Sequence, residues 1–258
     1  MWDLFVSIFT NVLLWIYNLL GAGQHMFGIA IILFTILIRI VTWPLNAQQM
    51  KSAKAMQDLQ NDPDWQKIQK KYAKDREKLA QEQMRVYREK GINPFGSCLP
   101  TLIQFPILIG LYQAIIRALG ATPLDLLKLS RSINTDLLDV ANLIPLKSQF
   151  LWMNLGQPES VPIFGFALPT LAIVVALTTY IQSKLTLPPS TNPNDQTAAM
   201  GQSMTITMPL MLGWFALTFP SGLAVYFITS NLLGIIQYAA QGKANWSNLL
   251  PKSMRKDK

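Results

Sequence analysis

Arg39 is the one charged side chain inside the apolar run from residue 27 to residue 45. A charge at this depth in a bilayer costs on the order of 2.5–3.5 kcal/mol, so we expect Arg39 to face protein or water rather than lipid. Thr35 lies four residues earlier on the same helix face and would place a hydroxyl beside the guanidinium. Together they could bind an acidic or hydrogen-bonding group inside the membrane. In the alternative, Arg39 extends its side chain to the lipid headgroups.

Other site chemistries have few candidate residues. The single cysteine, Cys98, excludes a disulfide framework and a cysteine-based metal cluster, and the single histidine, His25, excludes a His-rich metal site. No Gly-x-x-x-x-Gly-Lys-Ser/Thr phosphate loop occurs. We therefore predict that the protein is not an enzyme and has no catalytic residues, no metal site and no cofactor.

The composition indicates a membrane protein. Half of the 258 residues are hydrophobic and 14% are charged, against about 25% charged residues in soluble domains. The mean hydropathy is +0.25. We predict an all-α integral membrane protein with five transmembrane helices, none of which contains Asp or Glu. Their predicted ranges are 25–46, 94–117, 162–183, 203–220 and 221–241.

The distribution of charge orients these spans. Residues 47–93 hold eleven of the 22 Lys and Arg residues and the tail 242–258 holds five more, whereas residues 117–161 hold four positive and four negative side chains. By the positive-inside rule, 47–93, the loop 184–202 and the tail are cytoplasmic, and the loop 118–161 is extracytoplasmic. This places the N-terminus outside and the C-terminus in the cytoplasm. The absence of a transit peptide favours a bacterial plasma membrane.

Residues 1–24 have a different pattern, with polar side chains at helical spacing on an apolar helix. We predict an amphipathic helix in the outer interface, with its aromatic side chains at headgroup depth. A sixth span over residues 2–20, or an uncleaved signal sequence, is the alternative. The polar positions are Asp3, Ser7, Thr10, Asn11 and Asn18.

The cytoplasmic segment 47–93 is predicted to be a helical hairpin. The sequence Asn-Asp-Pro-Asp over residues 61–64 breaks the first helix, and a second helix runs from Trp65 to Lys90. We expect the hairpin to dock partners, although a solvated helical pair with no partner has the same composition. The candidate docking residues are Lys67, Lys70, Lys71, Lys74 and Arg76.

Three short stretches carry more information than the composition. The first follows Arg39 and reads Trp-Pro-Leu-Asn-Ala-Gln-Gln over residues 43–49. The second, over 93–107, contains Asn-Pro-Phe-Gly-Ser-Cys-Leu-Pro and then Gln-Phe-Pro-Ile. The third, over 208–237, contains Met-Pro and then Phe-Pro-Ser-Gly-Leu before Tyr226. In this order and spacing they resemble the YidC/Oxa/Alb membrane-protein insertase family over nearly the whole chain.

The resemblance implies a five-helix core around a polar groove, which is open to the cytoplasm and to lipid and closed on the outer side. The family's groove arginine and the threonine one turn before it correspond to Arg39 and Thr35. Gln104 matches a polar groove position, and an aromatic pair corresponds to Tyr226 and Phe227. Position 227 is often tyrosine or tryptophan in relatives, and Phe227 lacks their polar tip. The resemblance is to bacterial YidC-like members without the large extracytoplasmic domain.

We therefore expect a membrane protein insertase and chaperone. It would receive nascent membrane proteins in the groove and release them laterally into the bilayer. Its expected partners are nascent membrane proteins, the lipid bilayer, the Sec translocon and the ribosome, and not DNA. An anion channel with Arg39 as its filter or a small-solute transporter is the alternative, although coupled transporters usually carry acidic residues within the membrane. A purely structural membrane subunit is the third hypothesis.

Overall fold

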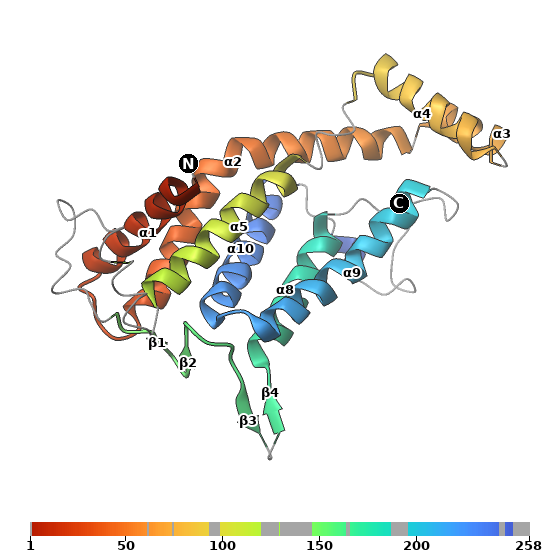
Figure 1. Cartoon of the computed structure of the whole chain (residues 1–258). Helices are drawn as coiled ribbons and strands as arrows, with labels where there is room; N and C mark the ends of the chain where they lie inside the picture. Colours follow the sequence, from red (N-terminus) through yellow and green to blue (C-terminus); the bar gives the residue numbers. More distant parts are fainter. Residues whose placement is uncertain are drawn as a thin grey trace.

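The computed structural model describes residues 2–60, 62–73, 75–92, 99–119, 129, 146–163, 166–186, 196–242 and 246–249. It is a helical bundle with four short strands at one end and a helical hairpin at the other (Figure 1). The long bundle helices are α2 (Met26–Gln60), α5 (Leu99–Ala118), α8 (Thr170–Thr186), α9 (Gln196–Thr218) and α10 (Ser221–Ala240).

The bundle is organised around α10. This helix packs against α2 on one side and α8 on the other, and α8 also packs against α9. Most of the largest buried side chains of the bundle pack into one apolar core. Core residues on α10 and α5 include Leu223, Tyr226, Leu111 and Ile115.

The helices do not stop where hydropathy alone placed the span borders. α2 continues without a break from the apolar run into the predicted hairpin, with Pro44 inside it. α9 begins at Gln196, inside the predicted loop 184–202. Among the described residues, three helices are long and apolar enough to cross a membrane, namely Trp2–Leu19, Met26–Met56 and Ser221–Ala240, and Thr205–Thr218 is a shorter apolar helix. A count of five spans remains a prediction.

The predicted span 162–183 is wrong in its first part. Strands β3 (Val161–Ile163) and β4 (Phe166–Leu168) form an antiparallel pair there, and α8 starts only at Thr170. Hydrophobicity alone does not distinguish a short apolar strand from a segment of helix. Pro169 disfavours helical geometry in the residue before it, Leu168, which agrees with a start of α8 directly after this proline.

A second strand pair closes the same end of the bundle. Strands β1 (Gln149–Phe150) and β2 (Met153–Asn154) are antiparallel, and we call residues 149–157 the capping loop. The loop holds the first turn of α10, because the Gly222 amide donates to the Leu155 carbonyl over 3.0 Å and the Ser221 amide to the Gln157 carbonyl over 2.8 Å. These bonds satisfy amides that an α-helix leaves unpaired at its N-terminus.

Helix α1 (Trp2–Leu19) lies along α2 and α5. Its first turn contacts the last part of α5, where Asp3 pairs with Arg117 over 2.9 Å and the Trp2 indole donates to Gln113 over 3.2 Å. Its last turn contacts the start of α2 through an edge-to-face pair of Tyr17 with Phe27. Both ends of α1 are therefore attached to the strand-bearing half of the bundle.

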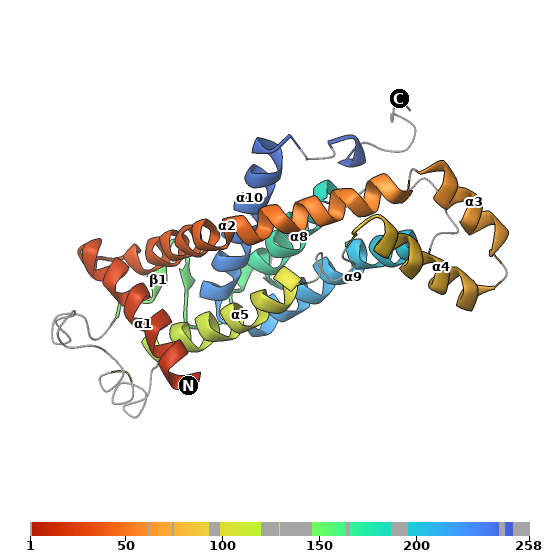
Figure 2. The same ribbon diagram turned by 90° about the horizontal axis from the view of Figure 1, so that it is seen from above.

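The hairpin at the opposite end comprises α3 (Pro63–Lys71) and α4 (Arg76–Glu89), beyond the end of α2 (Figure 2). The single helix predicted from Trp65 to Lys90 is wrong. Helix α3 ends at Lys71 with Tyr72 as its C-cap, and α4 begins after Asp75, which accepts a hydrogen bond from the Lys78 amide. A small separate core joins the hairpin to α2, and it consists of Leu59, Trp65, Val86 and Tyr87. A short 3₁₀ helix, η2 (Trp246–Leu249), lies in the predicted tail and contacts α8.

Acidification is expected to loosen the hairpin. Asp62 accepts from the Lys90 ammonium and from the Asp64 amide, and these bonds lower its pKa. A carboxyl with a lowered folded-state pKa stabilises the fold above its unfolded value of about 3.9, and this stabilisation is lost as the pH falls through the folded-state pKa. Spin labels at Lys70→Cys and Arg88→Cys, in a Cys98→Ser chain, should give a broader distance distribution at about pH 3 than at about pH 7. Asp62→Asn should broaden it at both, and an unchanged distribution at low pH would contradict the prediction.

Candidate functional site

The guanidinium of Arg39 points at α10. One terminal nitrogen, Nη2, donates to the Ser230 carbonyl over 2.6 Å and to the Ser230 hydroxyl over 2.8 Å. The side chain is half-buried. Hydrogen bonds to a charged donor are stronger than neutral ones, so this pair fixes the arginine against α10.

Tyr226 continues the network across the bundle. Its side chain is 1% exposed, and its hydroxyl accepts a short hydrogen bond from the Gln104 amide of α5. The same hydroxyl interacts with Ser230, and Tyr226 and Tyr238 are both close enough to Arg39 to interact with its charge. Polar groups of α2, α10 and α5 are thereby joined inside an apolar bundle.

The five residues proposed for the groove do not all join this network. Arg39, Gln104 and Tyr226 do. The Thr35 hydroxyl is buried and donates to the Ile31 carbonyl of its own helix over 2.7 Å. Phe227 is half-buried, and its ring contacts that of Tyr226 at a centroid distance of 5.6 Å. Thr35 and Phe227 therefore form the surroundings of the network rather than its hydrogen bonds.

Ser230 was not among the predicted site residues, although it binds Arg39 directly. It lies four residues after Tyr226 and thus on the same helix face. A second polar group on α10, the amide of Asn231, donates to Thr179 over 2.8 Å and to Thr178 over 3.1 Å. These bonds link α10 to α8, on the side away from Arg39's own helix.

The charge of Arg39 has no acidic counterpart in the described part of the chain, where every ion pair involves other residues. A guanidinium carries five N–H donors, and the hydrogen bonds seen here use a single nitrogen. Across the same residues no group of three or more His, Cys, Asp or Glu side chains could hold a metal ion. The site thus suits a ligand that brings its own negative charge or carbonyl oxygens.

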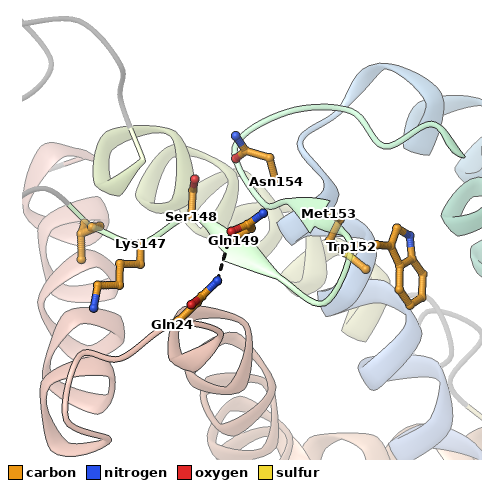
Figure 3. Close-up of a pocket in the computed structure, with 8 residues that line it drawn as sticks. Gln24, Lys147, Ser148, Gln149, Trp152, Met153 and Asn154 are labelled. Atoms are coloured by element: carbon orange, nitrogen blue, oxygen red, sulfur yellow. Dashed lines mark hydrogen bonds between the residues drawn. The ribbon is translucent and has the colours of Figure 1, made fainter.

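A cavity of about 430 Å³ lies elsewhere, beside the capping loop (Figure 3). Its lining includes Lys147, Trp152 and Asn154, and a hydrogen bond of 3.2 Å joins two further lining residues, Gln24 and Gln149. None of the predicted groove residues lines it.

Three of the five candidate docking residues are exposed on the hairpin. Lys67, Lys70 and Lys71 are exposed on α3, and Lys67 pairs with Asp64 over 2.9 Å. Arg76 is the first residue of α4. Lys74 lies outside the described residues.

Comparison with known proteins identifies the family. The profile of the "60Kd inner membrane protein" family matches residues 15–245. The membrane protein insertase YidC of Oceanobacillus iheyensis is 36% identical over 238 residues, which cover 90% of this chain and 81% of that protein. The chain belongs to the YidC family of membrane protein insertases.

Further similarities agree with this assignment. The insertase MisCA of Bacillus subtilis is 34% identical over 241 residues, covering 92% of this chain and 77% of that protein. A crystal structure of an active YidC insertase has a TM-score of 0.56 and 27% identity, and the match covers 91% of this chain and 45% of the solved chain. The predicted family, the helical membrane fold and the insertase function are confirmed. Members of the family are insertases rather than enzymes, and the channel or transporter alternative is not supported.

Removing the Tyr226 hydroxyl should weaken the bundle. Tyr226→Phe leaves the Gln104 amide and the Ser230 hydroxyl without this buried partner, and we expect the free energy of unfolding to fall by about 1 kcal/mol. Thermal unfolding in detergent micelles measures the change. Tyr180→Phe is the control, because the Tyr180 ring contacts Lys184 and its hydroxyl makes no hydrogen bond in the described part of the chain. Equal unfolding temperatures for wild type and Tyr226→Phe would contradict the role of this bond.

Proposed function

We propose that the network of Arg39, Ser230, Tyr226 and Gln104 receives the polar end of an entering membrane protein. The observation that carries the proposal is a guanidinium held inside an apolar bundle by Ser230, with no acidic partner in the described residues. An acidic or carbonyl-rich client segment would supply the missing counter-charge. Its attraction to Arg39 would lower the cost of bringing that segment part-way into the bilayer.

The apolar segment of the client would then move sideways into lipid. Helix α9 supports this step, since it presents exposed apolar side chains at successive helical turns. Burial of an apolar helix in the bilayer is itself favourable, so the release needs no nucleotide. The exposed residues are Ile206, Leu210, Trp214 and Leu217.

We further propose that the strand-bearing end faces outward and the hairpin faces the cytoplasm. The basic residues of the hairpin lie at the end of the bundle opposite the strands (Figure 1), as the positive-inside rule requires. The capping loop then closes the outer end. Because both ends of α1 contact the strand-bearing half, residues 2–20 would lie in the outer interface rather than form a sixth span.

The hairpin and the basic tail are proposed to meet cytoplasmic partners. Exposed Lys67, Lys70 and Lys71 would attract the phosphates of ribosomal RNA or of anionic lipids. A ribosome or the Sec translocon docked there would deliver the nascent chain next to the cytoplasmic end of α2. The bacterial plasma membrane is the proposed location.

Reconstitution tests the function. Liposomes that contain only this protein should insert a single-span reporter with an acidic tail, whereas protein-free liposomes should not. A photo-crosslinking amino acid at Gln104 should capture the reporter, and one at Ile236, which is 62% exposed on α10, should capture it far less. Anion conductance without insertion would favour a channel, and failure of both assays would favour a structural subunit.

A further inference from the structure

Gly234 is the point on α10 where side chains of two other helices converge. It is buried, and it lies one turn after Ser230. A Cβ atom built at this position would overlap the amide nitrogen of Gln182, which belongs to α8, and would lie 3.1 Å from the Gln182 Cδ and 3.3 Å from the Arg39 Nη2. No side chain fits here unless Gln182 moves.

The four-residue spacing between Ser230 and Gly234 explains why a side chain at position 234 would affect Arg39. In an α-helix the carbonyl of residue i bonds to the amide of residue i+4, so the Ser230 carbonyl lies against the backbone of Gly234. Arg39 is a second donor to that same carbonyl. Because Gly234 has no side chain, the Arg39 guanidinium can reach the Ser230 carbonyl from the side. A methyl group at position 234 would reduce the space available to the guanidinium.

We propose that Gly234 is a positioning residue for the client-binding arginine, because its missing side chain lets the Arg39 guanidinium and the Gln182 amide lie side by side against α10. The proposal rests on the function proposed above. It adds Gln182 as a second polar group next to the charge, contributed by α8. The preference for acidic client tails then depends on the lack of a side chain at position 234 as well as on the charge itself.

The matched control is Gly213, which is also a buried bundle glycine. A Cβ there would lie 3.1 Å from the Ala176 Cβ and 3.4 Å from the Ala172 carbonyl, between α9 and α8 and with no charged neighbour. Gly213→Ala therefore crowds a contact between two helices without touching Arg39, although its closest contact is longer than the one at Gly234. Any effect of crowding alone should appear in both variants.

The experiment compares insertion of two single-span clients that differ only in an acidic or a neutral tail. We expect Gly234→Ala to lower the acidic-to-neutral ratio about fivefold and Gly213→Ala to leave the ratio unchanged. Since the closest overlap is with Gln182, the double variant Gly234→Ala with Gln182→Ala should regain most of the ratio, a non-additivity that marks direct coupling. A normal ratio in Gly234→Ala, while Arg39→Ala lowers it, would overturn the inference and leave the proposed function intact.

A second measurement separates the two proposals. If Arg39→Ala itself leaves the ratio unchanged, the proposed role of Arg39 in client binding fails. The contact between position 234 and Gln182 is then tested by the unfolding temperatures of the single and double variants in nanodiscs. Non-additive temperatures for Gly234→Ala and Gln182→Ala support the contact, and additive temperatures overturn it.

Discussion

Replacing Arg39 with alanine is expected to reduce insertion of an acidic-tailed, single-span client about tenfold. Two unit charges 4 Å apart interact by about 4 kcal/mol at an effective dielectric constant of 20. Desolvation of the client's carboxylate offsets much of this gain. If a net attraction of about 1.4 kcal/mol remains, its loss in Arg39→Ala lowers the insertion rate about tenfold. The measurement is the initial rate of reporter protection in liposomes with equal amounts of wild-type and variant protein.

The same client with a neutral tail is the control, and its insertion should change much less. Arg39→Lys keeps the charge but loses the planar fork that lets one group serve Ser230 and a client together. We therefore expect it to fall between wild type and Arg39→Ala. Full activity of Arg39→Ala toward the acidic client would remove this residue from the mechanism without affecting the family assignment.

Replacing Gly28 with alanine is expected to displace the capping loop. A Cβ at this position would overlap the Phe150 ring and would lie 2.8 Å from its Cδ1 atom. The overlapping atoms are at the base of the ring, close to the Phe150 backbone, so the side chain cannot bend away from the new methyl group as the far end of a flexible side chain could. Overpacking of this kind costs about 1–3 kcal/mol. Unfolding temperature in nanodiscs and the rate of tryptic cleavage after Lys147, which lies two residues before the capping loop, measure the effect.

Two further variants make the Gly28 result specific. Gly23→Ala is the control, because the nearest atom to its Cβ would be the Met26 Cγ at an ordinary 3.4 Å. Phe150→Leu in the Gly28→Ala chain should restore part of the stability, since a smaller side chain leaves room for the methyl group. Unchanged cleavage and unfolding in Gly28→Ala would show that Phe150 does not hold the loop to α2.

The main features of the fold follow from local properties of the chain. Hydropathy and the positive charge of residues 47–93 predict apolar helices with a basic hairpin at one end. The break at Pro63 is also local, since a proline without an amide hydrogen suits the first turn of a helix. The break after Tyr72 was missed because no proline or glycine marks it, and Asp75 becomes a cap only through its bond to Lys78.

The sequence by itself determined that the charge of Arg39 must avoid the hydrocarbon layer, because burial of an unpaired charge there is costly wherever the helix goes. Its choice of partner depended on tertiary structure, since Ser230 lies 191 residues away and meets Arg39 only where α10 packs against α2. The glycines show the same division. The order of residues shows where the glycines are, but the neighbour that an added side chain would displace is fixed only when the helices pack. That neighbour is Phe150 at Gly28 and Gln182 at Gly234.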